Sequence, residues 1–483
     1  MLQAPQRYLN FIGNELEPAD SGETIAVVDP SNGETFASIP RSRASDVDRA
    51  VRAARRAFEG AWGRFSALER SRLLMRLAGL VDSHREELAQ LESRDTGKPL
   101  KQGRADALAL SRYFEFYAGA ADKLHGQTIP YQAGYTVLTV REPHGVTGHI
   151  IPWNYPMQIF GRSVAASLAV GNACVVKPAE DACLTLIRVA QLAAEAGLPA
   201  GALNVVTGLG AEAGQALAEH PGIDHISFTG SPDTGRRVAQ AGAQHHCPVT
   251  LELGGKSPQI VFDDADLQAA LPVLVNAIIQ NGGQTCSAGS RVLIQQGIHD
   301  ALMERLIERF AALKAGPALA DLDLGPLVSR RQLERVWDYL SDAQSSGLSF
   351  AAQGIVQDSA PSAGFYQAPV LLTRVPRDDK LFQEEIFGPV LVTTPFKDEH
   401  EAIALANGTR YGLVAGVWTR DGGRQLRMAH AIRGGQVFIN NYGAGGGVEL
   451  PFGGVGASGH GREKGFEALY AFTTLKTIAI RHD

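Results

Sequence analysis

Short apolar runs alternate with helical patterns between residues 146 and 242, and this rhythm constrains the fold more than any other feature of the chain. Strands are expected at residues 146–151, 173–177, 203–206 and 225–228, and helices at 162–170, 184–196, 211–220 and 234–242. Strands and helices that alternate at these lengths predict a parallel sheet covered by helices.

A second α/β unit is expected farther along the chain. At 483 residues the sequence is too long for one ordinary core, and strand and helix patterns resume between residues 257 and 436. Helical spacing also recurs at 45–92 and 103–123, before the first strand of the parallel sheet. The segments 136–143 and 471–481 alternate like strands and stand outside both units.

Charge and composition argue against several classes of function. Lysine and arginine number 45 and aspartate and glutamate 51, so the net charge of −6 leaves no basic footprint for nucleic acid or an anionic membrane. Four irregularly spaced cysteines, no signal-peptide pattern and no apolar run of about 18 residues favour the cytoplasm. No metal is expected, because His245-His246-Cys247 lacks a second ligand pair at suitable spacing.

Cys286 lies among small residues, as a nucleophile requires. It belongs to Gly282-Gly283-Gln284-Thr285-Cys286-Ser287-Ala288-Gly289, which follows an apolar helical stretch at 269–279. Small neighbours leave room for a substrate and let backbone N–H groups point at whatever bonds to the sulfur. From this stretch alone, a buried structural cysteine on a tight turn is the alternative.

Three further segments carry residue types suited to chemistry. In Leu251-Glu252-Leu253-Gly254-Gly255, apolar neighbours disfavour the charged carboxylate, which suits a general base near neutral pH; a salt-bridged or surface glutamate is the alternative. The amide of Asn154 can donate to an oxyanion or only stabilise its turn. Lys177-Pro178-Ala179-Glu180 ends a strand, where parallel sheets bind ligands, although a solvated strand end would look the same.

Two glycine-containing turns follow strands and open helices. Gly208-Leu209-Gly210-Ala211-Glu212-Ala213-Gly214 suits a dinucleotide pyrophosphate at a helix N-terminus. Its spacing departs from the standard fingerprint, so an ordinary glycine-rich turn is an equal alternative. Phe228-Thr229-Gly230-Ser231 repeats the context and offers a second set of backbone donors.

Taken in order, these segments resemble the NAD(P)-dependent aldehyde dehydrogenase superfamily. The resemblance spans most of the chain, and the segments around Glu252 and Cys286 are the family's signature pair. The matching motifs are Pro152-Trp153-Asn154-Tyr155-Pro156, Lys177-Pro178-Ala179-Glu180, Phe228-Thr229-Gly230-Ser231, Leu251-Glu252-Leu253-Gly254-Gly255-Lys256, Gly283-Gln284-Thr285-Cys286, Glu384-Glu385-Ile386-Phe387-Gly388-Pro389 and Pro451-Phe452-Gly453-Gly454. Seven motifs in register favour a catalytic over a structural Cys286.

The resemblance implies an enzyme that oxidises an aldehyde to its carboxylic acid with NAD. Cys286 would attack the aldehyde carbon, and Asn154 and the Cys286 N–H would hold the oxyanion of the thiohemiacetal. Glu252 would activate the water that hydrolyses the resulting thioester. Two rivals are a CoA-acylating member, against which Glu252 argues, and a non-catalytic binding or structural protein, against which all three residues argue.

By the same resemblance, several motifs supply the cofactor contacts. Lys177 and Glu180 would contact the adenosine ribose and Glu385 the nicotinamide ribose, with Phe387 beside it. The Glu180 carboxylate would repel a 2′-phosphate, which favours NAD over NADP. The full expected set is Ile151, Pro152, Trp153, Lys177, Ala179, Glu180, Gly210, Gly214, Phe228, Thr229, Gly230, Ser231, Glu385 and Phe387.

The expected substrate residues are Tyr155, Arg162 and Phe452. Arg162 stands where many members have tryptophan, and Ser163 where they have lysine. This arginine resembles the succinate semialdehyde and lactaldehyde branches and could pair with a substrate carboxylate; a bond to Glu463 or to a neighbouring helix is the open alternative. Gly445-Gly446-Gly447 replaces an aromatic loop, which would widen the pocket for a bulky aromatic aldehyde.

The expected fold class is α/β, with three parts. A Rossmann-like cofactor domain would cover residues 1–122 and 143–253, and an α/β catalytic domain residues 254–470. Residues 123–142 and 471–483 would form a small β oligomerisation element. Because its strand edges need covering, a homodimer or homotetramer is expected.

Overall fold

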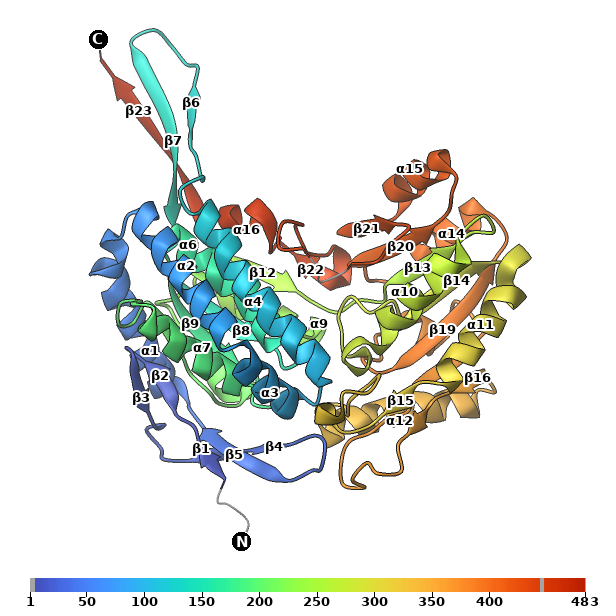
Figure 1. Ribbon diagram of the computed structural model, residues 1–483. Coiled ribbons are helices and arrows are strands. Elements are labelled where there is room, and N and C mark those ends of the chain that lie inside the picture. Colours follow the sequence, from blue (N-terminus) through green and yellow to red (C-terminus); the bar gives the residue numbers. More distant parts are fainter. Residues whose placement is uncertain (1–4, 444–446, 483) are drawn as a thin grey trace.

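Two α/β lobes lie side by side in the computed structural model, which describes residues 5–443 and 447–482, and a β arm projects from the first lobe (Figure 1). The first lobe is built on an eight-stranded sheet of order β22-β12-β11-β8-β9-β10-β2-β3. The second lobe is built on a seven-stranded sheet of order β16-β18-β19-β14-β13-β20-β21. The predicted α/β class is therefore confirmed.

Parallel strands form the centre of the first sheet. They are β8 (Val146–Ile151), β9 (Ala173–Pro178), β10 (Leu203–Val205), β11 (His225–Thr229) and β12 (Val249–Glu252), and the edge strands are β22 (Gly459–His460), β2 (Asn10–Ile12) and β3 (Glu15–Glu17). Each predicted strand starts at the expected residue and ends within one residue of expectation. Strands buried on both faces read as continuous apolar runs, which is why the pattern predicts them well.

Helices pack against this sheet (Figure 1). They are α1 (Ala44–Glu59), α2 (Ala67–Ser83), α3 (Arg85–Thr96), α4 (Leu100–Ala120), α5 (Pro156–Phe160), α6 (Ala166–Val170), α7 (Leu184–Glu195), α8 (Gln215–Ala218) and α9 (Pro232–Ala243). A π-helical turn, η2 (Gly161–Ala165), joins α5 to α6, so the helix expected to start at residue 162 starts at Pro156. A second π turn, η3 (Gly210–Gly214), precedes α8.

The second sheet follows the same plan. Its strands are β13 (Pro258–Val261), β14 (Arg291–Gln295), β16 (Ser349–Gln353), β18 (Val370–Thr373), β19 (Val390–Phe396), β20 (Val414–Trp418) and β21 (Gln436–Ile439). Its helices include α10 (Leu267–Ile279), α11 (His299–Ala311), α12 (Arg330–Ser345), α14 (Glu399–Ala406) and α15 (Gly422–Ala431).

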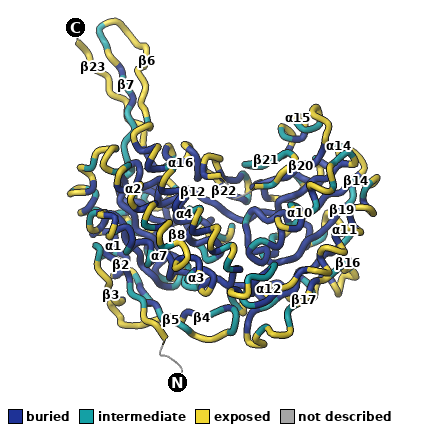
Figure 2. Tube along the Cα trace, viewed as in Figure 1, coloured by how far each residue is buried: buried dark blue, intermediate teal, exposed yellow. Residues whose placement is uncertain are grey.

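The β arm joins two distant segments of the chain. In it, β23 (Thr473–Arg481) pairs antiparallel with β7 (Tyr135–Pro143), and β7 pairs with β6 (Gln127–Ile129). Figure 2 shows this arm as mostly exposed, unlike the sheets of the two lobes. The strands predicted at 136–143 and 471–481 thus lie side by side, outside both lobes.

One boundary differs from expectation. Residues 459–470, expected in the catalytic domain, pack with the first lobe: β22 pairs with β12, and α16 (Gly465–Ala471), whose last residue was expected in the oligomerisation strands, contacts α6. Ala468 and Leu469 belong to the same apolar core as the first sheet. A two-residue strand has no detectable periodicity, so the sequence pattern could not reveal this return.

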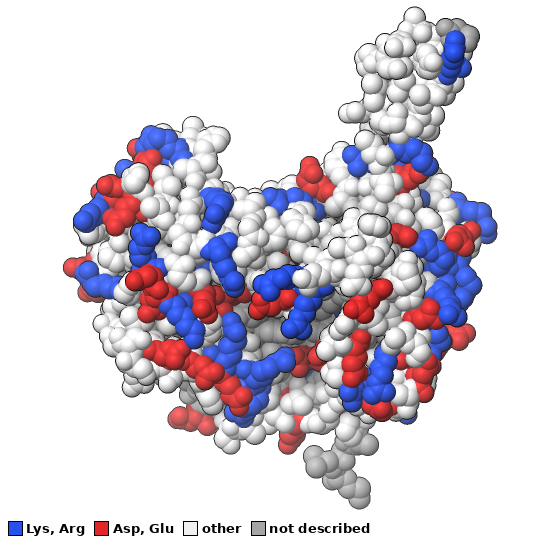
Figure 3. Space-filling model, turned by 180° about the vertical axis from the view of Figure 1, so that it is seen from behind, with Lys and Arg blue, Asp and Glu red and all other residues white. Residues whose placement is uncertain are grey.

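Positive and negative side chains are interspersed over the face shown in Figure 3. No helix among the described residues is both long enough and apolar enough to cross a membrane.

Candidate active site

The cysteine loop, residues 280–290, is held in a conformation that glycine accommodates. It follows α10, and Gly282 and Gly283 adopt positive φ angles of 61° and 76°. A β-carbon on Gly283 would lie 2.1 Å from the carbonyl oxygen of Gly388, so a larger residue would displace the loop. The glycines before Cys286 therefore fix the position of its half-buried thiol.

Glu252 approaches the same place from the end of β12, where it pairs in register with Thr229. A β-carbon on Gly255 would lie 2.3 Å from the carbonyl oxygen of Cys286, so the chain after β12 packs directly on the backbone of the cysteine. A β-carbon on Gly453 would lie 2.7 Å from Glu252 Oε1. Gly255 thus lets the segment after Glu252 pack on the cysteine loop, and Gly453 lets its own loop pack on the Glu252 carboxylate.

Asn154 and Tyr155 attach the turn after β8 to the cysteine loop. Asn154 Nδ2 donates to the carbonyl oxygen of Gln284 (3.0 Å), and Asn281 Nδ2 donates to the carbonyl oxygen of Asn154 (2.8 Å). The hydroxyls of Tyr155 and Thr285 are 3.0 Å apart. These bonds hold the Asn154 amide beside the nucleophile, where a donor to an oxyanion must lie.

Burial controls the ionisation of both catalytic candidates. It raises the pKa of the Cys286 thiol to about 11; the charge of Arg162 opposes this effect, and Glu385 and Glu252 add to it. Burial also raises the pKa of Glu252 well above its usual range. Neither Glu252 oxygen has a hydrogen-bond partner among the described residues. Arg162 is thus the cation that favours the thiolate.

Arg162 is buried on the π turn η2 and already has a carboxylate partner. Its Nε forms an ion pair with Glu463, and its Nη2 donates to Thr229 Oγ1 (3.1 Å). Ser227 Oγ donates to the other oxygen of Glu463 (2.7 Å). Of the two alternatives for this arginine, the structure shows the bond to Glu463, because the guanidinium is engaged within the protein.

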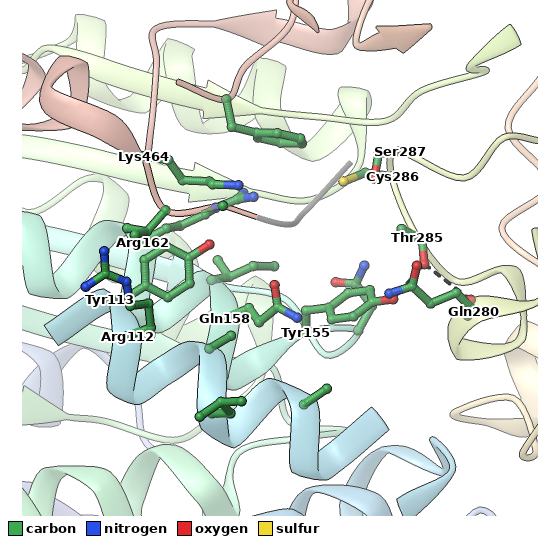
Figure 4. A pocket seen from close by; sticks show the side chains of 18 of the residues that line it. Arg112, Tyr113, Tyr155, Gln158, Arg162, Gln280, Thr285, Cys286, Ser287 and Lys464 are labelled. Carbon is green, nitrogen blue, oxygen red and sulfur yellow. Dashed lines mark hydrogen bonds between the residues drawn. The ribbon is translucent and has the colours of Figure 1, made fainter. Parts of the chain in front are cut away.

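A cavity of about 530 Å³ opens onto the sulfur (Figure 4). Cys286 and Asn154 line it, together with the three expected substrate residues Tyr155, Arg162 and Phe452. Gly447 also lines it, whereas Gly445 and Gly446 lie outside the described residues. The cavity therefore brings together the expected nucleophile, oxyanion donor and substrate residues.

The expected adenosine-ribose residues lie at the end of β9. Lys177 Nζ is 3.1 Å from Glu180 Oε2. Burial alone would raise the pKa of Glu180, but the Lys177 ammonium and the N–H of Gly210 outweigh it and hold that pKa below its ordinary value. A β-carbon on Gly214 would lie 3.7 Å from Lys177 Cδ, so η3 packs beside this pair. The N–H of Ala179 donates to the carbonyl oxygen of Ile151 (2.8 Å) at the same sheet edge, and Pro152 follows Ile151 directly after β8.

The turn after β11 forms a second part of the cofactor region. A β-carbon on Gly230 would lie 2.6 Å from Phe228 Cζ, so only glycine fits over the ring. Ser231 caps α9 by accepting the N–H of Thr234 (3.3 Å). This leaves a helix N-terminus facing the sheet edge, a suitable position for phosphate.

The expected nicotinamide-ribose residues come from the second lobe. Glu385 Oε1 accepts the N–H of Gly255 (2.9 Å), and burial raises the pKa of this carboxyl to about 7. Phe387, at φ of 63°, packs edge-on against Trp153 with ring centroids 5.3 Å apart. The pair Trp153 and Phe387 bridges the two lobes near the cysteine loop.

Comparisons with known proteins agree with this geometry. The model of the aldehyde dehydrogenase family matches residues 17–478. The chain belongs to the aldehyde dehydrogenase family. It is 43% identical to a hydroxyisobutyraldehyde dehydrogenase of Mycolicibacterium austroafricanum, over 98% of this chain and 93% of that protein. The predicted family is therefore confirmed.

Solved aldehyde dehydrogenases share the whole fold. A crystal structure of a candidate aldehyde dehydrogenase from Burkholderia cenocepacia is 71% identical, with a TM-score of 0.98 over 98% of this chain and 100% of that one. The NAD⁺ complex of an aldehyde dehydrogenase from Bacillus cereus is 40% identical, with a TM-score of 0.96 over 99% of this chain and 97% of that one.

Several cavity residues of this aldehyde dehydrogenase were not expected from sequence. They are Arg112, Tyr113, Gln158, Glu449 and Lys464. They come from α4, α5 and the segment before α16, and no local motif marks them.

Among residues 5–443 and 447–482, no cluster of three or more histidine, cysteine, aspartate or glutamate side chains could hold a metal ion.

Proposed function

We propose that this aldehyde dehydrogenase oxidises an aldehyde to its carboxylic acid with NAD, using Cys286 as a covalent nucleophile. The observation that supports this most is the convergence of three groups: Cys286 and Asn154 line one cavity, and Glu252 lies close enough to influence the pKa of the thiol. A nucleophile, an oxyanion donor and a base are the parts that acyl-enzyme chemistry requires.

The reaction begins when the Cys286 thiol loses its proton, which the charge of Arg162 assists. The thiolate attacks the aldehyde carbon, and the carbonyl electron pair moves to oxygen, where Asn154 Nδ2 and the Cys286 N–H stabilise it. Bound NAD supplies the hydride acceptor that turns this thiohemiacetal into a thioester. Glu252 then takes a proton from water, the hydroxide adds to the thioester carbon, and the acid leaves as the thiolate is regenerated.

NAD as the cofactor is confirmed by the NAD complexes among the solved relatives. Lys177 and Glu180 would hold the adenosine ribose and Glu385 the nicotinamide ribose, with the α9 N-terminus near the pyrophosphate. The residues present fit the cofactor, because Glu180, ionised beside Lys177, can accept ribose hydroxyls at the end of β9. The ionised Glu180 would repel the 2′-phosphate of NADP, so we propose a preference for NAD.

The domains of the chain have separate proposed roles. We propose that residues 1–122 and 143–253 bind the cofactor, that 254–470 complete the catalytic unit apart from the returning residues 459–470, and that 123–142 and 471–483 mediate assembly. A homodimer or homotetramer in the cytoplasm is the proposed form.

NADH absorbance across a panel of aldehydes tests the proposed reaction. We expect turnover by the wild type, none by Cys286→Ala, and a burst of about one NADH per subunit with Glu252→Gln, because the thioester then persists. Intact-mass measurement of Glu252→Gln after the burst should find the acyl group on Cys286. Turnover by Cys286→Ala, or wild-type turnover that requires CoA, would contradict the proposal.

A further inference from the structure

The first turn of α4 places Gln102 against the cysteine loop of the other lobe. Gln102 Oε1 accepts the N–H of Asn281 (2.9 Å), and Gln102 Nε2 donates to the hydroxyl oxygen of Tyr155 (2.8 Å). Asn281 and Tyr155 are buried, so the loss of Gln102 would remove a partner from two buried polar groups. No matched motif contains Gln102, and the proposed reaction gives it no role.

The two bonds fix the orientation of the Gln102 amide. A backbone N–H can only donate, so the amide oxygen must face Asn281 and the amide nitrogen must face Tyr155. The Tyr155 hydroxyl accepts from this nitrogen and is left to donate its own proton to Thr285 Oγ1 (3.0 Å). Thr285 in turn donates to the carbonyl oxygen of Gln280 (3.4 Å). The hydrogen bonds therefore run in one direction, from Gln102 to the start of the cysteine loop.

Both ends of this chain of hydrogen bonds meet at one peptide unit. The carbonyl oxygen of Gln280 and the N–H of Asn281 belong to the same peptide, at which the loop leaves α10. Asn281 lies in the left-handed region, with φ of 51° and ψ of 34°. Figure 4 shows Thr285 beside Tyr155 and marks the bond from Thr285 to Gln280 with a dashed line. The chain therefore holds the peptide that sets the course of the loop.

Asn281 and Tyr155 extend this constraint to the proposed oxyanion donor. Asn281 Nδ2 donates to the carbonyl oxygen of Asn154 (2.8 Å), and Tyr155 is the residue next to Asn154 in the chain. Gln102 thus holds Asn154 from two sides, once across the lobes and once along the backbone. A donor stabilises an oxyanion effectively only when its position is fixed before the charge develops.

We propose that Gln102 is a positioning residue that fixes the Asn154 amide where the oxyanion of the thiohemiacetal forms. It acts through Asn281 and Tyr155 and is not among the described residues that line the cavity. This inference rests on the proposed aldehyde oxidation and adds to it a contact between the lobes on which the oxyanion site depends.

Two reactions of Cys286 separate positioning from general support of the fold. Aldehyde oxidation develops negative charge on oxygen, whereas alkylation by iodoacetamide displaces iodide from a saturated carbon and needs no oxyanion donor. For Gln102→Met we expect kcat/KM for the best aldehyde of the panel to fall about 10- to 100-fold, with the alkylation rate of Cys286 within about threefold of the wild type. The matched control is Gln90→Met: Gln90 is an exposed glutamine of α3 whose amide bonds Glu86 (3.0 Å), and both rates should stay at wild-type values.

A double-mutant cycle tests whether Gln102 acts through Asn154. If Gln102 positions this amide, Gln102→Met should cost less than about threefold in kcat/KM once Asn154→Ala has removed it. Tyr155→Phe removes one hydroxyl of the hydrogen-bond chain with little change in volume and should show the same selective loss of oxidation. This second variant tests the inference even where Gln102→Met folds poorly.

Four outcomes would contradict a positioning role for Gln102. Wild-type turnover with an unaltered Gln102→Met variant overturns the inference and leaves the proposed reaction standing, whereas no turnover by the wild type overturns both. Equal losses in oxidation and alkylation would mean that Gln102 supports the fold alone. A full loss from Gln102→Met in the Asn154→Ala background would mean that Gln102 does not act through this amide.

Discussion

Glu252 is the residue at which ionisation should be visible in both activity and stability. Burial raises its carboxyl pKa well above the ordinary range, and neither oxygen has a hydrogen-bond partner among the described residues. The proposed base must be ionised, so kcat should rise as pH increases through this raised pKa. The acid limb of the kcat profile should therefore lie well above pH 4.5, the ordinary value for glutamate.

The same shift predicts the sign of a stability change. Because the folded pKa exceeds the unfolded one, the protonated form is favoured in the fold, and stability is lost as pH rises through the folded pKa. Glu252→Gln should therefore raise the free energy of unfolding at pH 9, by about 1.4 kcal/mol for each unit by which folding raises this pKa, because the amide is neutral without binding a proton. Below about pH 4 both states are protonated and the gain should vanish. Calorimetric Tm values against pH, with the exposed Glu59→Gln as control, measure it; a gain that persists at pH 4 would refute it.

Sequence reasoning finds the candidate catalytic residues, which lie within motifs, and it misses cavity-lining residues that lie outside any motif. Cys286, Glu252 and Asn154 each stand within a motif that suggests a role; Cys286 and Asn154 line one cavity, and Glu252 lies close enough to influence the pKa of the thiol. Lys464 lies outside every matched motif, and its backbone has a positive φ that no residue pattern encodes. For Arg162 the sequence left two alternatives open, because its choice of Glu463 depends on contacts between distant segments.

The helix from α5 through η2 to α6 shows how an element positions the cavity wall. Its π turn inserts an extra residue per turn and places Arg162 toward Glu463. Gly161 allows the helix to approach α4, because a β-carbon there would lie 2.7 Å from Tyr113 Cδ2. The apolar character of this stretch predicts a helix but not its π turn, because residues 156–170 are buried at every position except Gln158, so a shift in helical phase leaves no mark on the pattern.

Gly161→Ala should therefore disturb both stability and the cavity. The buried Tyr113 ring must shift, so we expect a loss of about 1–3 kcal/mol, as in other overpacked sites, together with a raised KM. Gly79→Ala is the matched control: Gly79 is exposed within α2, a β-carbon there meets nothing within 4 Å, and the change should stabilise by about 0.5–1 kcal/mol. Chemical unfolding and steady-state kinetics measure both; an unaltered Gly161→Ala variant would show that the two helices can separate without cost.

At the scale of the whole molecule, the arm is the part that the single chain leaves uncovered. In the order β23-β7-β6, the outer strands β23 and β6 have open edges. Ile478 and Ile480 on β23 are 38% and 47% exposed, so an apolar strip lies on one face of the arm. Exposed strand edges with apolar side chains pair readily with another chain.

Disruption of this strip should change the state of assembly. Ile478 and Ile480 lie on one face of β23, because side chains two residues apart share a face. The double change Ile478→Asp and Ile480→Asp places two charges on the strip, so we expect light scattering to report a smaller assembly than the homodimer or homotetramer proposed for the wild type. Leu319→Asp alters an equally exposed leucine, 59% exposed, away from the arm and should leave the mass unchanged. Retained alkylation of Cys286 would show that the double variant is folded, and an unchanged mass for it would mean that the arm does not mediate assembly.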